Sequence, residues 1–274
     1  MKLYLVCPNL EIGGAEKNTV NLANELHLRG FDVSVVLLKR EGIFIKDLSP
    51  EIELISLNKS RSRYAFLSFA RIIKNNENAV VISMLRESSL MVSLSLMVSG
   101  AKAFFIIREA CHYENLGIFN KIITKFFYSK ANIFVSNSGS TLKSFKTNNI
   151  LGNVRSKIIY NPALSKNFFE RLQEPLEHEW LDNPEIKTIA CGGRLVEEKG
   201  FDKIIKAFRI FSQKNHHVRL IILGDGSQKQ HLKELIGKLD LNDKIEMIGF
   251  VDFPALYFKK SDLYVQASSN EGFG

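Results

Sequence analysis

The feature that most constrains this chain is a regular alternation of short apolar strands with amphipathic helical segments. In the first half of the sequence the alternation predicts strands at 2–7, 31–38, 79–84, 103–107, 133–136 and 157–160, with helices at 14–29, 88–98 and 119–128. Strands that alternate with helices are typical of a parallel sheet covered on both faces. The pattern therefore predicts an α/β fold.

A polar stretch at 165–185 interrupts the alternation. It contains Pro175, Pro184 and the only tryptophan, Trp180, and it has no clean helical period. The pattern then restarts, with strands at 188–191, 218–223, 245–248 and 263–267 and helices at 201–213, 228–239 and 254–259. We therefore expect two doubly wound domains, at 1–164 and 187–274, joined by an interdomain connection at 165–186.

Composition and cysteine spacing exclude several classes of protein. The best apolar run, at 88–99, has about a dozen residues, whereas a membrane-spanning helix needs about 20. The N-terminus turns polar at Pro8, which is too early for a signal peptide. Cys7, Cys111 and Cys191 are widely spaced and form no C-x-x-C pair, which argues against a disulfide framework or a zinc site. We expect a cytoplasmic protein with reduced thiols.

The net charge of +8 is unevenly distributed. Residues 1–164 hold 21 Lys and Arg against 12 Asp and Glu, whereas the remainder of the chain has a slight negative excess. Such an asymmetry is typical of a domain that contacts an anionic surface or an anionic acceptor. A basic face that contacts only water is the alternative. No nucleic-acid-binding motif accompanies the charge, so nucleic acid is not an expected partner.

Two segments, at 59–73 and 119–130, combine Lys and Arg with apolar residues at helical spacing. In the second segment the apolar stripe consists of Phe119, Ile122, Ile123, Phe126 and Phe127. An interfacial membrane helix has this pattern, and so does a helix packed on its own sheet. The packed helix is the favoured interpretation, although the basic residues could still meet anionic headgroups.

Two cations follow a predicted strand of the second half. Arg194 and Lys199 lie in Gly-Gly-Arg-Leu-Val-Glu-Glu-Lys-Gly, between the strand at 188–191 and the helix that begins at 201. A guanidinium and an ammonium in this position could bind one diphosphate. The Arg side chain would donate a bidentate pair of hydrogen bonds, and the Lys ammonium would act as a point charge. Surface pairing with Glu197 and Glu198 is the alternative.

Two loops of the first half carry further candidates. Gly13 and Gly14 lie between the first strand and the first helix, where free backbone amides favour a phosphate or a polarised hydroxyl. Glu16, in the opening turn of that helix, could contribute to such a site or could simply complement the helix dipole. Their spacing is not G-x-G-x-x-G, so a standard dinucleotide fingerprint is absent. After the strand at 103–107, Glu109 or His112 could act on a sugar hydroxyl or in an acid–base step, whereas a lone loop histidine is often merely solvated.

The last six residues, Ser-Asn-Glu-Gly-Phe-Gly at 269–274, form a strand-to-helix turn whose amides could hold an anion. Four earlier motifs precede it in order: GGAE at 13–16, GRL at 193–195 with KG at 199–200, GDG at 224–226 and GFV at 249–251. Each motif is common by itself. The ordered set covers nearly the whole chain and resembles the retaining GT-B glycosyltransferases of family four, the glycosyl transferases group 1.

The resemblance implies two Rossmann-like domains that face a cleft and a role for each matched residue. Arg194 and Lys199 would bind the donor diphosphate and stabilise the leaving nucleotide in place of a metal, and the chain indeed has no Asp-x-Asp pair. Glu271 would hold a hydroxyl of the donor sugar. The other donor-binding residues would be Gly13, Gly14, Gly193, Phe250, Val251, Gly272, Phe273 and Gly274, with Phe250 and Val251 beside the base. His112 falls where relatives often place a catalytic or sugar-contacting residue.

The implied function is transfer of a hexose-type sugar, with retention, from a nucleoside diphosphate sugar to a glycan or glycolipid in cell-surface polysaccharide synthesis. The donor is a co-substrate, and no other cofactor is expected. The basic first half would place the protein in the cytoplasm or peripherally on the inner face of the membrane. Relatives continue past Glu271 to a second glutamate and a C-terminal helix, so we expect a C-terminally truncated second domain and slow turnover. A non-catalytic remnant that only binds the donor nucleotide, and a nucleotide-sugar epimerase of the same fold, remain alternatives.

Overall fold

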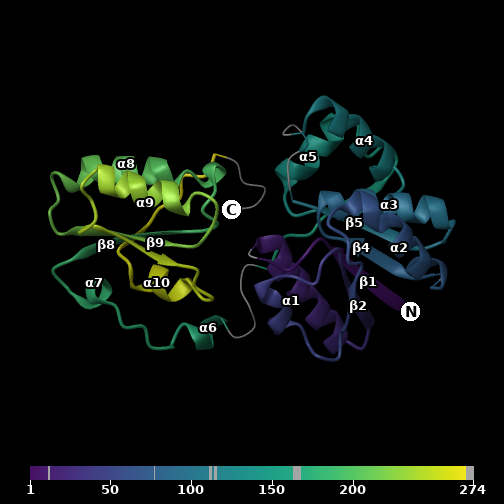
Figure 1. Ribbon diagram of the computed structural model, residues 1–274, viewed down its shortest axis with the longest axis horizontal. Helices are drawn as coiled ribbons and strands as arrows, with labels where there is room; N and C mark the ends of the chain where they lie inside the picture. The colour runs from purple at the N-terminus through teal and green to yellow at the C-terminus, as the bar shows by residue number, and fades with distance from the viewer. Residues whose placement is uncertain (12, 77, 111–112, 114–115, 163–167, 270–274) are drawn as a thin grey trace. The chain divides into compact units, whose positions relative to one another are not determined.

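The computed structural model describes residues 1–11, 13–76, 78–110, 113, 116–162 and 168–269. These residues form two compact units, the first of which spans Met1–Pro162 and the second of which contains the described residues from Phe168 onward (Figure 1). Each unit has its own parallel sheet and its own hydrophobic core. The α/β class predicted from the alternating pattern is confirmed. The predicted domain boundaries at 164 and 187 stay a prediction.

The first unit is built on a seven-stranded parallel sheet of order β3-β2-β1-β4-β5-β6-β7. Its strands are β1 (Lys2–Cys7), β2 (Asp32–Leu37), β3 (Glu53–Ser56), β4 (Val80–Ser83), β5 (Phe104–Glu109), β6 (Ile133–Ser136) and β7 (Arg155–Ile158). The connecting helices are α1 (Gly14–Leu28), η1 (Ile43–Asp47), α2 (Ser62–Lys74), α3 (Arg86–Ser99), α4 (Ile118–Tyr128) and α5 (Gly139–Thr147). The chain reverses its direction of travel across the sheet between β1 and β4, which is where doubly wound folds bind ligands.

Helices cover both faces of this sheet because its central strands are apolar on both sides. Along β1, Leu3 and Leu5 pack with residues of α1 and η1, whereas Tyr4 and Val6 pack with residues of α2, α3 and α4. Successive side chains of a strand point to opposite faces, so a continuous apolar run fills two cores at once.

The second unit has a four-stranded parallel sheet of order β10-β9-β8-β11. Its strands are β8 (Lys187–Gly192), β9 (Val218–Leu223), β10 (Ile245–Gly249) and β11 (Leu263–Tyr264), and its helices are α6 (Phe168–Arg171), α7 (Glu179–Asp182), η3 (Glu197–Lys199), α8 (Phe201–Ser212), α9 (Lys229–Lys238) and α10 (Ala255–Lys260). The winding direction reverses between β8 and β11. The loops after these two strands therefore meet at the same edge of the sheet.

The described part of the polar stretch after residue 165 belongs to the second unit and packs against its α10 region. Arg171 Nη1 lies 3.2 Å from Asp252 Oδ2, and its guanidinium lies over the ring of Phe253. Lys260 Nζ lies 2.6 Å from Asp182 Oδ1. These contacts hold α6 and α7 beside α10, although the sequence here has no clean helical period.

Most of the predicted strands and helices are confirmed to within two residues, and three differences have physical causes. Strand β3 was not predicted because its four residues, ELIS, form a partly polar edge strand. Helix α5 was not predicted because it is short and polar, and only its cap, Ser138, gives a signal. The strand predicted at 263–267 contains only Leu263 and Tyr264, which pair on one side alone, with β8.

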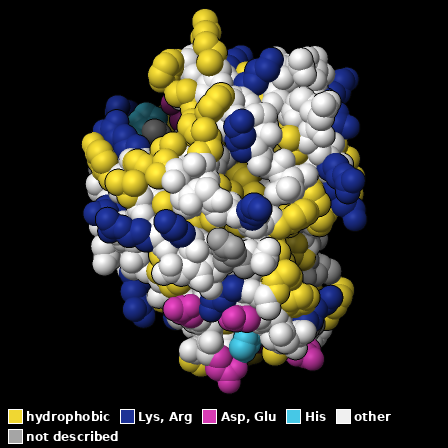
Figure 2. Space-filling model, turned by 90° about the vertical axis from the view of Figure 1, so that its right-hand side faces the viewer, with side chains coloured by type: hydrophobic (Ala, Val, Ile, Leu, Met, Phe, Trp, Pro, Cys, Tyr) yellow, Lys and Arg dark blue, Asp and Glu magenta, His cyan; other side chains and the backbone are white. Residues whose placement is uncertain are grey.

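The packed-helix interpretation is correct for α2 and wrong for most of the apolar stripe of α4. In α2, Phe69 and Ile73 are fully buried. In α4, by contrast, Phe119, Ile122 and Phe126 are 75%, 65% and 52% exposed. Hydrophobic side chains are visible on the upper part of the face in Figure 2, which is the level at which Figure 1 places α4 in the first unit.

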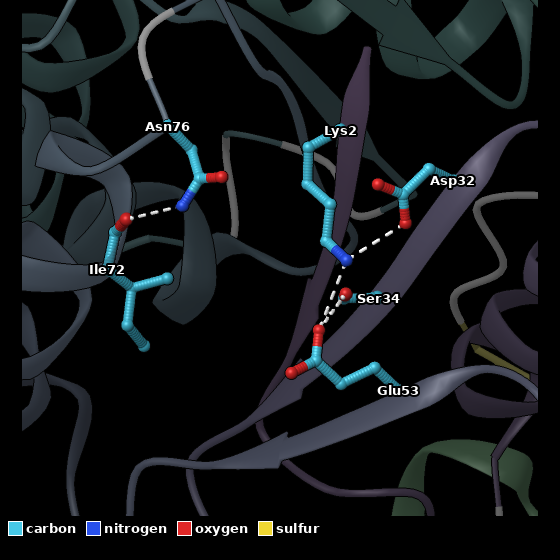
Figure 3. Close-up of polar contacts among 6 residues, drawn as sticks. All are labelled: Lys2, Asp32, Ser34, Glu53, Ile72 and Asn76. Atoms are coloured by element: carbon cyan, nitrogen blue, oxygen red, sulfur yellow. Dashed lines mark hydrogen bonds and ion pairs between the residues drawn. The ribbon is translucent and has the colours of Figure 1, made fainter.

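A cluster of charged side chains joins the first residues of three strands (Figure 3). Lys2 Nζ lies 2.9 Å from Asp32 Oδ1 and 3.2 Å from Glu53 Oε2, and the Ser34 hydroxyl donates to the same Glu53 oxygen at 2.7 Å. The hydrogen bonds from Ser34 and Lys2 hold the pKa of Glu53 below its ordinary value. This cluster fixes the relative register of β1, β2 and β3 at the amino edge of the sheet, away from the loops that carry the candidate site.

The two described cysteines provide a test of the cores. Burial raises the pKa of Cys7 and of Cys191 to about 12. Because the thiolate is the reactive form, we expect neither thiol to be alkylated by iodoacetamide at pH 8 in the native protein, and both to be alkylated in urea. Peptide mass spectrometry locates the label. Native labelling of either cysteine as fast as in urea would contradict the burial described here.

Candidate functional site

Three loops of the second unit are joined by backbone hydrogen bonds at the carboxyl edge of its sheet. Between the loops after β8 and β9, the Leu195 amide donates to the Asp225 carbonyl at 2.9 Å, and the Gln228 amide donates to the Leu195 carbonyl at 2.9 Å. The segment after β11 joins them, because the Ser269 amide donates to the Glu198 carbonyl at 2.9 Å. Motifs that are far apart in the sequence therefore form one cluster.

Glycine makes the close approach of these loops possible. Gly224 has a φ of +133°, and a Cβ there would lie 1.8 Å from the Gly193 carbonyl oxygen. Gly200, with a φ of +66°, would place a Cβ 2.4 Å from the Ala267 carbonyl oxygen. Both positions combine left-handed backbone with backbone contact, so any larger residue would separate the loops.

Arg194 and Lys199 lie near the two ends of the loop between β8 and α8. Arg194 is exposed, and its side chain lines an open hollow of about 1060 Å³ together with Gln228, His231 and Ser269. Lys199 is partly buried at the end of η3 and is not among the residues that line this hollow. The structure thus places both cations in one short loop but brings only Arg194 to the hollow.

The hollow is of mixed charge and lies beside a helix N-terminus. Glu197, Glu198 and Asp202 line it as well as Arg194, and Phe201 and Asp202 are the first residues of α8. The dipole of this 12-residue helix favours an anion near its first turn. The sequence analysis assigns no role to His231, which lies on α9 and also lines the hollow.

The Gly-Asp-Gly turn after β9 supports the cluster. Asp225 accepts hydrogen bonds from Lys229 Nζ at 2.6 Å and from the Gly226 amide at 2.8 Å, and these two contacts lower the pKa of its carboxyl group. The Gly224 amide donates to the Gly249 carbonyl at 2.7 Å. Gly249 is the last residue of β10, so this hydrogen bond connects the segment that begins with Phe250 and Val251 to the loop cluster. The Phe250 ring is 41% exposed.

In the first unit, the glycine loop lies at the start of α1. Gly13 is the N-cap residue of this helix, and a Cβ built there would lie 2.0 Å from Glu16 Oε2. The Glu16 carboxylate therefore lies against Gly13, in the first turn, where it complements the helix dipole. Gly14 has no neighbour within 4 Å of an added Cβ.

Glu109, at the end of β5, has a structural partner. Its carboxylate is buried, with only 2% of the residue exposed, and it accepts a hydrogen bond from the Tyr128 hydroxyl at 2.6 Å. Burial and the nearby carboxylate raise the pKa of Tyr128 well above its ordinary value, so the phenol stays a donor. Arg108, the preceding residue, donates to Asn161 Oδ1. These contacts hold the end of β5 against α4 and against the segment after β7.

The sequence analysis missed a polar group at the end of β6. Ser136, Asn137 and Ser138 are buried, and among the residues that the structure describes Asn137 Oδ1 has no hydrogen-bond partner. The Ser138 hydroxyl accepts from the Thr141 amide and caps α5. The tripeptide Ser-Asn-Ser before a glycine, directly after an apolar strand, was the signal that could have identified this turn.

Several predicted site residues lie outside the described residues: His112, Glu271, Gly272, Phe273 and Gly274. Their roles stay predictions, as do those of the candidates placed above. Within the described ranges, no three His, Cys, Asp or Glu side chains come together as metal ligands would. Among the described helices none is both long and apolar enough to cross a bilayer.

The comparisons with known proteins agree with the fold and with the ordered motifs. Residues 173–274 match the family described as Glycosyl transferases group 1. An uncharacterized glycosyltransferase of Haemophilus influenzae is 25% identical over 95% of this chain and 72% of its own length. The N-acetylgalactosamine-N,N'-diacetylbacillosaminyl-diphospho-undecaprenol 4-alpha-N-acetylgalactosaminyltransferase of Campylobacter jejuni is 25% identical over 99% of this chain and 76% of its own length.

Solved structures show the same architecture. Anabaena Alr3699/HepE, in complex with UDP-glucose, superposes with a TM-score of 0.79 at 18% identity, over all of this chain and 76% of that protein. WaaG, a glycosyltransferase involved in lipopolysaccharide biosynthesis, gives a TM-score of 0.73 at 14% identity, over 98% of this chain and 76% of WaaG. The predicted resemblance to group 1 glycosyltransferases of GT-B fold is therefore confirmed.

Two glycines provide a matched test of the loop cluster. We expect Gly224→Ala to lower the free energy of unfolding by about 1–3 kcal/mol or more. An alanine at this φ is disfavoured, and its Cβ would collide with the Gly193 carbonyl oxygen. Gly237→Ala in α9 adds the same atom where nothing lies within 4 Å and should raise stability by up to about 1 kcal/mol. Urea denaturation measures both. Equal midpoints for Gly224→Ala and the unchanged protein would contradict the proposed backbone contact.

Proposed function

We propose that this chain transfers a hexose-type sugar, with retention, from a nucleoside diphosphate sugar to a glycan or glycolipid acceptor in cell-surface polysaccharide synthesis. The observation that carries the proposal is the convergence of the loops after β8, β9 and β11, which brings Arg194 and the start of α8 to one hollow. The match of this unit to group 1 glycosyltransferases supports a nucleotide-sugar donor here.

The chemistry that this site would perform is stabilisation of a leaving group. When the bond between the sugar and the diphosphate breaks, negative charge develops on the departing phosphate. Arg194 and the amides of the first turn of α8 would offset that charge, which is the kind of contact whose loss typically costs about 10²–10³ in rate. Lys199, near the other end of the same loop, would add its charge from outside the lining of the hollow. Glu271 would orient the sugar, and Phe250 would contact the base.

The acceptor would bind to the first unit, at the carboxyl edge of its sheet. The glycine loop at Gly13 and the loop that contains His112 follow strands β1 and β5 at this edge. The Campylobacter relative is named for an undecaprenol-linked acceptor and a Rhizobium relative for lipopolysaccharide core biosynthesis, and both names support a lipid-linked glycan. We accordingly propose that the protein works in the cytoplasm at the inner face of a membrane.

A test of the anion site measures how two arginine variants bind two ligands, UDP and uridine. UDP is the probe because similar structures contain it. Arg194→Ala should weaken UDP binding by about 10- to 100-fold and leave uridine binding unchanged, since hydrogen bonds to charged groups contribute roughly 1.5–3 kcal/mol. Arg209→Ala, in the last turn of α8, removes the same side chain at the opposite end of the helix and should change neither affinity. Equal losses of UDP and uridine on Arg194→Ala, measured by calorimetry, would refute the diphosphate assignment.

A second test separates the three candidate functions. The protein is incubated with a panel of nucleoside diphosphate sugars, with and without lipid-linked acceptors, and the products are identified by NMR. Transfer that needs acceptor and keeps the donor's anomeric configuration is the expected result. An epimerised donor without acceptor would identify an epimerase instead, and UDP binding without any product would identify a donor-binding remnant.

A further inference from the structure

The guanidinium of Arg108 is half-buried and has a neutral partner. Arg108 is the last residue but one of β5, and its Nη2 donates to the side-chain oxygen of Asn161, which follows β7. Burial lowers the pKa of Arg108, so its charge is partly removed from water. Among the described residues no Asp or Glu forms an ion pair with it. Because buried cations are usually paired with an anion, this arrangement favours binding of an anion from outside the chain.

The neighbouring acid, Glu109, points to the other side of the sheet. Successive side chains of a strand alternate between the two faces. The Glu109 carboxylate accepts from the Tyr128 hydroxyl at 2.6 Å and from the Ala110 amide at 3.1 Å. Its charge raises the pKa of Arg108 less than burial lowers it. Glu109 therefore does not compensate the guanidinium fully.

The face of the sheet that Arg108 shares is positively charged. In the register of β5, β6 and β7, Arg108 pairs with Val135, and Val135 pairs with Lys157. Paired residues of parallel strands lie on one face, so Lys157, which is exposed, belongs to the same row as Arg108. The sequence has eight Lys and Arg, and no Asp or Glu, at 115–169. The strands β6 and β7 thus bring no acid to this row.

Asn137 adds a buried acceptor beside the row. It is 2% exposed, and among the described residues its Oδ1 has no hydrogen-bond partner. Asn137 follows Val135 by two residues, and its amide donates to the Glu109 carbonyl at 3.3 Å, so the strand pairing continues to this point. The alternation then places Asn137 on the face of Arg108. A buried oxygen without a donor is costly, and a hydroxyl group would satisfy it.

We call Arg108, Asn137, Lys157 and Asn161 the β5–β7 edge group. Arg108 and Lys157 supply positive charge. The Asn161 oxygen accepts from Arg108, which leaves its NH₂ group as a further donor. Asn137 supplies an acceptor. The group therefore matches a ligand that carries an oxyanion next to a hydroxyl.

We propose that the β5–β7 edge group binds an acidic sugar of the acceptor. Arg108 and the Asn161 amide would contact its carboxylate or phosphate, and the Asn137 oxygen would accept from an adjacent hydroxyl. The group lies at the carboxyl edge of the first sheet, where the proposed function places the acceptor. The inference rests on that function and narrows the acceptor to glycans that carry a negative charge on the sugar being bound.

A purely structural Arg108 would behave differently. It would serve only to tie the segment after β7 to β5, and its removal would then lower stability. A partly buried charge that is retained for a ligand is instead a cost to the fold, which an apolar side chain of similar size removes. We therefore expect Arg108→Met to keep or raise the melting temperature.

The experiment titrates the whole chain with glucuronate, glucose 6-phosphate and glucose, at an ionic strength kept constant with sodium chloride. All samples carry Arg194→Ala, so that the hollow of the second unit does not contribute. Ligand binding is read as a rise in melting temperature. Both acids should stabilise the protein, and glucose should not. Arg108→Gln should weaken binding of the acids by at least about tenfold, and Arg108→Lys should weaken it less.

Two further variants sharpen the test. Asn137→Asp keeps the shape of the side chain and gives Arg108 a carboxylate in place of the ligand, so it should also weaken binding of the acids by about tenfold or more. Arg155→Gln removes an exposed arginine from the first residue of β7 and is the matched control for loss of one charge. It should leave the affinities unchanged. Stabilisation by only one acid would support the proposal and identify the anion as carboxylate or phosphate.

Four results would overturn the proposal. They are stabilisation by neither acid, stabilisation by glucose equal to that by the acids, unchanged acid binding in both Arg108→Gln and Asn137→Asp, and an equal loss in Arg155→Gln. The last would assign binding to the general positive field. If Arg108→Gln does not fold, Asn137→Asp decides the test. UDP binding to the protein with Arg194 intact is measured separately, and its absence would refute the donor site while leaving the result with the acids intact.

Discussion

Parallel pairing of the strands in both described sheets is the constraint on which the remaining structure depends. Each connection must cross a face of the sheet, which buries the central strands on both sides and requires the apolar runs seen in β1 and β9. It also makes the two edges of each sheet chemically different. In the first sheet the amino edge has the Lys2 cluster, which fixes register, whereas the carboxyl edge of the second sheet has the glycine-rich loops.

The loops at that edge show how backbone contact organises the candidate site. Because Gly193 and Gly224 approach each other without side chains between them, their neighbours are held by the main chain. Arg194 is then an exposed group of a loop that these backbone contacts hold. Preorganised cations are more effective in stabilising developing charge than mobile ones, since they need not reorganise during the reaction.

The sequence was sufficient for features that depend on local pattern and insufficient for those that depend on partners distant in the chain. Central strands such as β9 were predicted because continuous apolar runs and flanking glycines are local signals. The burial of Glu109 was not predictable, because its partner Tyr128 is on a helix that follows a loop. The orientation of α4 was also not predictable, since the apolar stripe alone does not say which side faces inward, and polar anchors on the other side decide it.

The hydrogen bond between Tyr128 and Glu109 has a mechanical consequence. It joins the inner face of α4 directly to the last residue of β5, the strand that precedes the loop containing His112. A shift of α4 would therefore be passed directly to the end of β5, because both partners of the hydrogen bond are buried.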